Sequence, residues 1–441
     1  MNPVRAAKGS PRGLFVRPKE RHVKLVDVLQ DNLAPSPLSA SLPGSPFVRL
    51  RALLDAHAPG APPVSLALGE PQHGAPDFVL AELARPTADY GKYPPITGTP
   101  EWRHAVSDWL GRRFGLDAAL LETPSQILPL NGTREGLFLA MQLAPQKPDG
   151  RVAMPDPFYQ VYAAAALAAQ AQPVYLPAPR ATGFLPDLDA IAPETFDKLQ
   201  ALYLCSPANP QGAIADAAYL RKALALARAH GFLLLVDECY AEIYDAPHVA
   251  PPVSMLEIMQ AEADDNAPVI VFHSLSKRSN LPGLRSGFCA GGRDIMQRFA
   301  ALRQIAGPQS PLPVLNAAML AWQDDDHVAA NRALYVAKCD DAEAQCDGRF
   351  GFYRPPGGFF LWLDVGDSAA ATLHLWQAQG VRVLPGAYLT RLADTPQDPA
   401  SNYIRVALVA PPEESHAAIA RLVAGLEDFT NGSKPVAGGT K

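Results

Sequence analysis

The chain of 441 residues is 48% hydrophobic and carries a net charge of −6, which indicates two domains with a large buried core and offers no basic surface for nucleic acid or an anionic membrane. No apolar run reaches the roughly 18 residues that a membrane-spanning helix needs, so we expect a soluble protein without a membrane partner. The five cysteines are scattered and include no CxxC pair, which argues against a disulfide framework or a metal site and favours a cytoplasmic location.

The chain divides into a central body and two end segments. The first residues are rich in Lys and Arg, but no apolar stretch follows them, so they do not resemble a secretory signal. We interpret residues 1–45 as a partly disordered extension and residues 433–441 as a disordered tail. Within the body we expect residues 91–310 to form a large domain and residues 311–432 a small one, with residues 46–90 packing on the small domain.

Short apolar runs alternate with helical patterns in the large domain. Asp216 is a candidate N-cap for an amphipathic helix that stops at Gly231. Strands that alternate with helices predict a mostly parallel sheet with helices on both faces. The strand-like runs are Arg151–Met154, Ala201–Cys205, Phe232–Val236, Val269–His273 and Ser286–Ala290.

The pattern changes from about residue 311. A long helical region extends to Ala344, and three strand-like runs and a closing helix follow it, which predicts a smaller α+β domain. The strand-like runs are Phe359–Leu363, Val381–Leu384 and Tyr403–Val409, and the closing helix covers Ala417–Phe429.

Polar residues stand at or just after the C-terminal ends of several predicted strands. Ligands bind at this edge of open α/β sheets, so the residues predict a binding site. They are Asn209, Asp237, Ser274, Ser276, Lys277 and Arg285. A pyridoxal phosphate site needs the same kinds of group. It uses a lysine amine for a Schiff base, a carboxylate against the pyridinium nitrogen, and hydroxyls and cations for the phosphate.

Nine segments, taken together, resemble one family. In chain order they are LALGEP (Leu66–Pro71), KYPPITGTPEWR (Lys92–Arg103), NGTREG (Asn131–Gly136), PDPFYQVY (Pro155–Tyr162), SPANPQG (Ser206–Gly212), VDECYAEIY (Val236–Tyr244), HSLSKRSNLPGLRSGF (His273–Phe288), PPGGFFLW (Pro355–Trp362) and NYIRVAL (Asn402–Leu408). Each is weakly specific alone, but together they resemble the fold-type I, class I/II aminotransferases that depend on pyridoxal 5′-phosphate. The resemblance implies an α/β fold. Its large cofactor-binding domain would have a mostly parallel sheet of seven-stranded type flanked by helices, beside a smaller α+β domain.

The wording of some segments is similar to that of the N-succinyldiaminopimelate aminotransferases. These strings are NGTRE, DECYAEIY, FHSLSKRSNLPGLRSGF and the later VLPGAYL. The stretch Gln304–Pro313 and the N-terminal residues depart from the pattern. Because we expect that stretch to help shape the substrate pocket, the acceptor is less firmly implied than the class of reaction.

The resemblance implies roles for four residues around the cofactor ring. Lys277 would form the Schiff base, Asp237 would pair with the pyridinium nitrogen, and Tyr240 and Asn209 would donate to the ring oxygen. Taken alone, Lys277 fits a solvated loop as well, and Asp237 fits a helix cap. Asn209 precedes a proline and therefore also fits a plain turn.

For the phosphate group, the resemblance implies a helix start on one side and a serine-containing turn on the other. The implied residues are Gly132, Thr133 and Arg134, with Ser274, Ser276 and Arg285 opposite. Glycine allows a close approach of the backbone, and a helix N-terminus supplies N–H groups. The alternative is a plain capped helix, and Ser276 has the further alternative of only shaping its turn.

Two tyrosines have implied positions next to the cofactor. Tyr159 would stack on the ring face, with its neighbour Phe158 as the competing choice. Tyr93 resembles the tyrosine that reaches the phosphate of the neighbouring subunit, which implies a homodimer with two active sites at its interface. The alternative for Tyr93 is a packed surface tyrosine.

Substrate binding is implied for Arg405 and Gly69. Arg405 lies between apolar residues in a strand pattern, so it must be paired or face a cleft, and its planar fork suits a substrate α-carboxylate. An internal salt bridge is the alternative. Gly69 would let the backbone approach the substrate. Arg278, Arg134 and the stretch Gln304–Pro313 are candidates for the distal end of the substrate.

The resemblance implies a two-stage amino transfer from glutamate to a keto acid. The implied acceptor is N-succinyl-2-amino-6-ketopimelate of the diaminopimelate and lysine pathway. The alternatives are an aminotransferase for aspartate, aromatic or other amino acids, and a pyridoxal phosphate-dependent C–S lyase of the same fold. A cofactor-binding regulator of DNA is disfavoured, because no basic helix-turn-helix pattern stands before residue 45.

Overall fold

The computed structural model describes residues 44–117 and 126–432, which belong to one compact unit. The predicted tail (433–441) and nearly all of the predicted extension (1–45) lie outside the described residues. Their disorder therefore stays a prediction. In the described ranges, no helix combines the length and apolar character needed to cross a bilayer.

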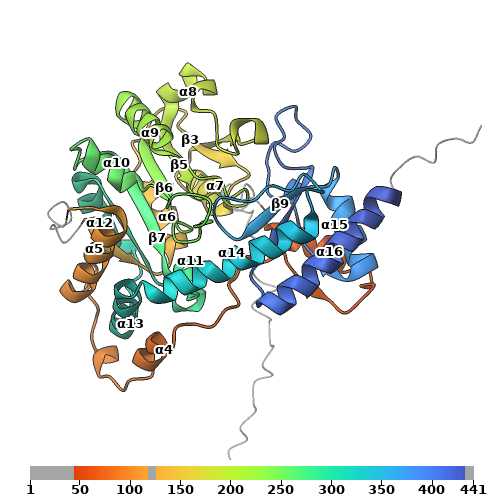
Figure 1. The fold of residues 1–441 in the computed structure, drawn as a ribbon. Coiled ribbons are helices and arrows are strands. Elements are labelled where there is room, and N and C mark those ends of the chain that lie inside the picture. The colour runs from red at the N-terminus through yellow and green to blue at the C-terminus, as the bar shows by residue number, and fades with distance from the viewer. Residues whose placement is uncertain (1–43, 118–125, 433–441) are drawn as a thin grey trace, which may run out of the picture. The chain divides into compact units, whose positions relative to one another are not determined.

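The largest sheet among the described residues has seven strands (Figure 1). Its strands lie side by side in the order β2-β8-β7-β6-β5-β3-β4. Only β8 runs antiparallel to its neighbours, β2 and β7, so the predicted mostly parallel sheet is confirmed. The strands are β2 (Ile127–Leu130), β3 (Arg151–Asp156), β4 (Gln172–Pro177), β5 (Leu199–Cys205), β6 (Leu233–Asp237), β7 (Val269–Ser274) and β8 (Gly287–Gly291).

The two edge strands, β2 and β4, were not among the predicted runs. Both contain proline, which weakens a strand pattern in the sequence because it lacks an N–H for the ladder. An edge strand tolerates this loss, since one side of its backbone has no neighbouring strand.

Helices cover both faces of this sheet because alternate side chains of the inner strands point to opposite sides. In β6, Leu234 and Val236 enter one apolar cluster, whereas Leu233 and Leu235 enter the other. Helices on the first face are α4 (Asp77–Leu83), α5 (Pro100–Phe114), α8 (Pro193–Lys198), α9 (Ala217–His230), α10 (Met255–Ala261) and α13 (Leu312–Gln323). On the second face lie α6 (Thr133–Ala140), α7 (Gln160–Ala168) and α12 (Arg293–Ala306).

Helix α9 begins and ends where the sequence predicts. The Asp216 side chain accepts a hydrogen bond from Tyr219 N, and Gly231 closes the helix in the left-handed conformation with φ of 62°. The buried residues of α9 face the sheet, and they are Leu220, Ala223, Leu224 and Ala227.

The C-terminal elements build a second, smaller core around an antiparallel sheet of order β11-β12-β9, which confirms the predicted α+β character. The predicted run Val381–Leu384 is split, because β10 pairs with β1 and β11 pairs with β12. Two N-terminal elements, α3 (Pro46–Leu54) and β1 (Val64–Ser65), join the C-terminal ones, which are α14 (Asp326–Cys346), β9 (Phe360–Asp364), α15 (Ser368–Gln379), β10 (Val381–Arg382), β11 (Leu384–Pro385), β12 (Tyr403–Ala407) and α16 (Pro412–Gly432). Short 3-10 turns are η1 (Asp89–Gly91), η3 (Met141–Leu143), η4 (Arg180–Thr182), η5 (Leu188–Ala190), η6 (Pro282–Leu284) and η7 (Gly386–Tyr388).

The packing departs from the predicted boundary at residue 311. Leu315 and Trp322 of α13 lie in the same apolar cluster as Trp109 of α5, so α13 covers the large sheet. Helix α4 also packs on α13, whereas α3 packs on α15 and β11. The polypeptide therefore turns towards the smaller sheet only with α14, which extends from beside the short helix α11 (Leu275–Arg278) to α16 (Figure 1).

Candidate active site

A cavity of about 280 Å³ lies where β3, β5, β6 and β7 end, at the edge that the sequence predicted for a ligand. It brings together most of the predicted site residues from segments that are far apart in the chain. Those that line it are Gly69, Thr133, Arg134, Tyr159, Asn209, Asp237, Tyr240, Ser274, Ser276, Lys277 and Arg285. The other predicted residues, Gly132, Tyr93 and Arg405, do not line this cavity.

Lys277 reaches the cavity from the four-residue helix α11. Ser274 caps this helix, since its Oγ accepts a hydrogen bond from Ser276 N. The Lys277 Nζ donates to Gly69 O at 2.5 Å. Burial lowers the pKa of the Lys277 amine to about 8, so a substantial fraction is neutral and nucleophilic at mildly alkaline pH. The solvated-loop alternative is therefore wrong.

Asp237 presents a buried carboxylate to the same cavity. Its Oδ2 accepts a hydrogen bond from Tyr162 OH at 2.8 Å, and its Oδ1 accepts one from Cys239 N at 3.2 Å. Burial raises its pKa, and no basic side chain in the described ranges forms an ion pair with it. No helix begins directly after Asp237, so the helix-cap alternative is wrong. A cationic ligand group beside it would remove the cost of this isolated buried charge.

Arg405, on β12, is 6% exposed and lies close to the cavity. It donates to Asn209 Oδ1 at 3.1 Å and to Ala67 O at 2.8 Å, and its guanidinium lies 4.4 Å from the centre of the Phe360 ring. No carboxylate pairs with it in the part of the chain that the structure describes, so the internal salt bridge is wrong. Burial lowers its pKa to about 10, and its Nε has no protein partner.

Gly69 and Tyr240 meet the same aromatic group. A Cβ on Gly69 would overlap the ring of Phe360, so only glycine fits there. Tyr240 packs edge-on against Phe359 and Phe360, with ring centres 5.4 Å and 6.1 Å away, and burial raises its pKa well above the ordinary value. These contacts fix the ring of Tyr240 beside the cavity in its protonated, hydrogen-bond-donating form.

The start of α6 and the turn around α11 form a basic, hydroxyl-rich end of the cavity. Gly132 has φ of 77°, and a Cβ there would overlap the guanidinium of Arg285. Within residues 44–117 and 126–432, Arg285 donates only to the carbonyls of Pro282 and Asn131. Arg134 donates to Tyr159 OH at 2.6 Å. Neither guanidinium forms an ion pair within the described residues, so both charges are available to an anion.

The two serines and the helix start add hydroxyls to this basic end. Ser274 Oγ donates to Ser276 Oγ at 2.9 Å, and both side chains line the cavity. Gly132, before the first residue of α6, makes no side-chain cap, which leaves N–H groups at the helix start for a ligand. The alternative of a plain capped helix is therefore wrong.

A second network positions this basic end from behind. Arg303, 1% exposed, donates to both carboxylate oxygens of Glu135 at 2.8 Å. Glu135 Oε1 in turn accepts a hydrogen bond from Asn131 N. Ser310, within the stretch predicted to shape the substrate pocket, donates to Asn131 Oδ1 at 2.7 Å. This stretch therefore supports the start of α6 and does not line the cavity of this chain.

Two tyrosine predictions have different outcomes. Tyr159 and Phe158 both line the cavity, and Phe158 also packs on Tyr175 with ring centres 5.1 Å apart, so the choice between them stays a prediction. Tyr93 is 97% exposed, which rules out a packed surface tyrosine. Its predicted contact with a neighbouring subunit also stays a prediction.

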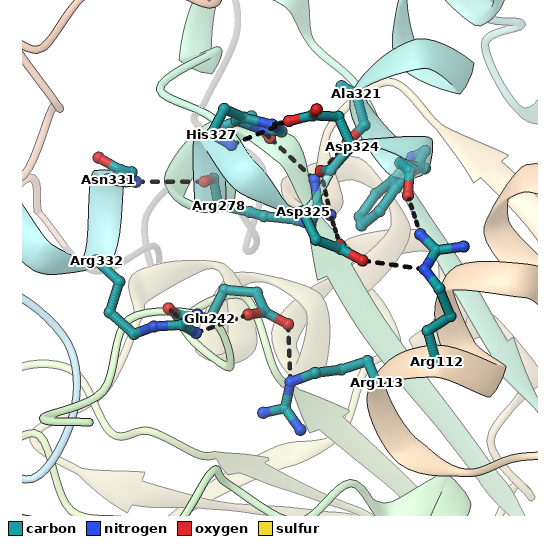
Figure 2. A network of polar contacts seen from close by, with 12 residues as sticks. Arg112, Arg113, Glu242, Arg278, Ala321, Asp324, Asp325, His327, Asn331 and Arg332 are labelled. Atoms are coloured by element: carbon teal, nitrogen blue, oxygen red, sulfur yellow. Dashed lines mark hydrogen bonds and ion pairs between the residues drawn. The ribbon is translucent and has the colours of Figure 1, made fainter. Parts of the chain in front are cut away.

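Arg278 is not available to the distal end of a substrate, so that prediction is wrong. Its side chain is 2% exposed and points towards the junction of α13 and α14, as Figure 2 shows. On that side the guanidinium lies over the rings of Trp109 and Trp322, at 5.4 Å and 4.9 Å from their centres. Aromatic faces stabilise a buried cation, which explains the direction of the side chain. Arg134 lines the cavity and remains a candidate.

Sequence reasoning missed several residues of the cavity. Tyr162, 75 residues from its partner Asp237, gave no local signal beyond its place in PFYQVY. Cys239 lies next to Thr133, with Sγ and Oγ1 3.1 Å apart. The remaining wall is mostly apolar and includes Leu68, Phe184, Leu185, Pro186 and Tyr219. Their positions depend on loop conformation, which alternation patterns do not predict.

The cavity fits pyridoxal phosphate by the chemistry of its lining. An amine with a lowered pKa, a buried carboxylate without a cationic partner, and a basic end shaped by Gly132 and Arg285 face one space. These are the groups that would hold an aldehyde, a pyridinium nitrogen and a phosphate, respectively. The fold and the cavity thus define a pyridoxal phosphate site of the α/β type.

Comparison with known proteins assigns the family. The family model for aminotransferases of class I and II matches residues 61–422, and the chain belongs to this family. The family resemblance inferred from the sequence is confirmed, and the protein is a pyridoxal phosphate-dependent aminotransferase.

Three similar proteins illustrate the range of the family. The 4-dedimethylamino-4-oxo-anhydrotetracycline transaminase OxyQ of Streptomyces rimosus is 33% identical, over 81% of this chain and 92% of its own. An LL-diaminopimelate aminotransferase of Dehalococcoides mccartyi is 32% identical, over 87% of this chain and 96% of its own. The crystal structure of an aminotransferase from Neisseria meningitidis superposes with a TM-score of 0.81 at 35% identity, covering 88% of this chain and 99% of that one.

Proposed function

We propose that the protein moves an amino group from glutamate to N-succinyl-2-amino-6-ketopimelate, in the diaminopimelate and lysine pathway. The observation that carries the aminotransferase site is the meeting of Lys277 and Asp237 on one cavity with Arg405 close by. The similarity to an LL-diaminopimelate aminotransferase supports a substrate of the diaminopimelate type.

We propose the following roles for the residues that face the cofactor. Lys277 would hold its aldehyde carbon, Asp237 its ring nitrogen, and Asn209 and Tyr240 its ring oxygen. When bound, the cofactor supplies an electron sink that stabilises negative charge on the α-carbon of the substrate. Asp237 favours this because an ionised carboxylate keeps a neighbouring ring nitrogen protonated.

Lys277 also has a proposed role in proton transfer. Its Nζ, facing the same cavity, would take the proton from the α-carbon of the substrate and hold it for return. A base for this task must be neutral, and burial lowers the pKa of Lys277 to about 8 in its favour. The carbonyl of Gly69 orients the amine from the other side.

Arg405 is the proposed anchor of the substrate α-carboxylate. Its guanidinium is buried and has no acidic partner among the described residues, so a substrate carboxylate would supply the missing charge. Because all amino-acid and keto-acid substrates of the reaction share that carboxylate, Arg405 would act in both halves of the reaction.

A homodimer is part of this proposal. Tyr93 would reach the phosphate held by the partner subunit, and its almost complete exposure leaves the side chain available for such a contact. Light scattering of the purified protein would test the dimer, and a monomer with full activity would contradict a shared site.

LL-diaminopimelate is a second candidate amino donor or product, because a relative that shares 32% identity is named for it. OxyQ, at 33% identity, is named as a transaminase of an anhydrotetracycline compound. Relatives at this level of identity therefore share amino transfer but differ in their acceptor. The two candidates differ at the distal end, where one carries a succinyl amide and the other a free amine.

A panel of substrates tests the proposal. Purified enzyme with glutamate and each keto acid in turn is followed by the formation of 2-oxoglutarate, and the reverse direction is run with N-succinyl-LL-diaminopimelate and with LL-diaminopimelate. The proposal expects the highest kcat/KM for the succinylated compound. Preference for free LL-diaminopimelate, aspartate or an aromatic amino acid would replace it, and release of pyruvate and ammonia would indicate a lyase.

The role of Lys277 has its own test. Lys277→Ala should abolish both the visible absorbance of the bound cofactor and transamination, because no amine remains to hold the aldehyde. Lys338→Met is a matched control, since Lys338 is also buried, with its pKa lowered to about 7, and binds His73 and Ala410 O away from the cavity. Normal turnover of Lys277→Ala, or an equal loss in Lys338→Met, would refute the assignment.

A further inference from the structure

The turn that carries Lys277 is held from the side opposite to the cavity. Helix α11 has only four residues, so its last carbonyls have no partners within the helix. The side chain of Asn331, on α14, donates to Lys277 O and to Arg278 O, both at 3.2 Å. Asn280 Nδ2 donates to Asn331 Oδ1 at 2.9 Å, which fixes the orientation of the amide. Asn331 thus caps the helix at the catalytic lysine itself.

Arg278 fastens the same turn to the junction of α13 and α14. Its guanidinium donates to Ser279 Oγ at 3.3 Å and to three acceptors at this junction, which Figure 2 labels. The acceptors are Ala321 O at 2.5 Å, Asp324 O at 3.2 Å and Asp325 Oδ1 at 3.0 Å. Two backbone carbonyls and a carboxylate in fixed directions define the position of a planar guanidinium more narrowly than one ion pair would.

We propose that Asn331 and Arg278 are positioning residues for Lys277. Neither side chain lines the cavity, so neither touches the cofactor or the substrate. They act on the backbone at residues 277 and 278, and through it on the direction in which the lysine side chain enters the cavity. The inference rests on the proposed role of Lys277.

We expect these contacts to affect the position of the Lys277 amine more than the stability of the fold. A displacement of about 1 Å at a reacting group can lower a rate by roughly 100-fold. Lys277 Nζ lies 2.5 Å from Gly69 O and would have to reach both the cofactor and the substrate α-carbon. Few positions of the amine satisfy these requirements together. With Asn331 or Arg278 changed, the short helix loses donated hydrogen bonds that fix its C-terminal end, and we expect the amine to lose its alignment.

Three variants and one control separate positioning from general stability. Asn331→Asp keeps the size and the acceptor for Asn280 but removes both donated hydrogen bonds. Arg278→Gln removes the cation, and Arg278→Lys keeps the charge but not the planar fork. The control is Arg112→Gln. Arg112 comes from α5 and binds the same junction, through Asp325 Oδ2 and Trp322 O at 3.0 Å each, and among the described residues it makes no hydrogen bond or ion pair with α11 (Figure 2).

The measurements are kcat and KM for glutamate, the melting temperature, and a pH titration of the visible absorbance of the bound cofactor. Asn331→Asp and Arg278→Gln should lower kcat roughly 10- to 100-fold with KM changed less than about threefold. Their absorbance midpoint should move by about 0.5 pH unit or more, because the environment of the lysine nitrogen changes. Arg278→Lys should recover part of both effects, and Arg112→Gln should leave both unchanged.

Each outcome bears on one of the two ideas. If the Asn331 and Arg278 variants melt earlier but keep the kcat and absorbance midpoint of the parent, the side chains are structural and the inference fails. The same holds if Arg112→Gln shifts the midpoint equally. If Lys277→Ala keeps its visible absorbance and its turnover, the proposed function fails instead, whatever the other variants do.

Discussion

Two almost fully buried arginines lie near Lys277, and their surroundings differ in one respect. Arg405 is 6% exposed and Arg278 is 2% exposed, and burial lowers the pKa of each to about 10. Each also lies over an aromatic ring, Phe360 for Arg405 and Trp322 for Arg278, at 4.4 Å and 4.9 Å. Arg278 has the carboxylate of a neighbouring helix as a partner, whereas Arg405 has no acidic partner in the described ranges.

The difference supports the proposal that Arg278 is a structural cation and that Arg405 binds a ligand. A buried guanidinium without a counter-charge costs free energy, and a fold retains such a group where something outside the chain neutralises it. Arg278 satisfies its charge inside the protein and fixes backbone. Arg405 has no acidic partner among the described residues and faces the region of Asn209 and Tyr159, and the Nε of each arginine lacks a hydrogen-bond partner there. The charge partner therefore predicts the role better than the degree of burial does.

The largest effect is expected for Arg405→Met. The kcat/KM for every amino-acid and keto-acid substrate should fall roughly 100-fold or more, as the loss of about 3 kcal/mol of charge-assisted hydrogen bonding implies. The free energy of unfolding without ligand should stay the same or rise, because the variant removes an unpaired buried charge. Steady-state kinetics on several substrates and denaturant unfolding check both parts. An effect confined to one substrate, or a large loss of stability, would break the comparison.

A smaller effect is expected for Asp325→Asn, which should lower stability and leave substrate binding unchanged. Arg278 loses its carboxylate but keeps two carbonyl acceptors, and the Asp325 side chain is 52% exposed, so the free energy of unfolding should fall by about 1 kcal/mol. The KM for glutamate should not change. Asp326→Asn, at the next and equally solvent-facing position of α14, serves as the control. A rise in KM with Asp325→Asn would show that the junction also serves the substrate.

The sequence predicted the inner strands and the main site residues but not how buried side chains are directed. β6 is a continuous apolar run with a carboxylate at its end, a pattern that predicts both a buried strand and a polar site at its C-terminal edge. Arg278 is a candidate for the distal end of the substrate from the sequence alone, and only the tertiary positions of Trp109 and Trp322 explain why its side chain turns away. No local sequence pattern indicates Tyr162 for the same reason, since Tyr162 lies on α7 and its partner Asp237 lies 75 residues away on β6.

The smallest expected effect is on the pH dependence of cofactor capture. It distinguishes the two arginines by their electrostatic effect on the Lys277 amine. Burial, and to a lesser extent the charge of Arg405, lowers the pKa of the Lys277 amine from its ordinary 10.5 to about 8. Only the neutral amine attacks an aldehyde, so cofactor capture by the cofactor-free protein should accelerate with rising pH and level off above about pH 8. In Arg405→Met this midpoint should rise by a few tenths of a unit, because a positive neighbour no longer disfavours the ammonium form.

The lowered pKa of Lys277 also determines the direction in which the free energy of unfolding changes with pH. Since the folded protein holds this proton more weakly than the unfolded chain does, the free energy of unfolding should increase with pH between about 8 and 10.5, and the cost of the buried ammonium is fully present below that window. Stopped-flow absorbance of cofactor capture in Arg405→Met, with Asp326→Asn as the control, measures the midpoint. Equal movement of the midpoint in both variants would mean that Lys277 responds to general loosening of the fold, and the distinction between a ligand-facing and a structural arginine would lose its electrostatic support.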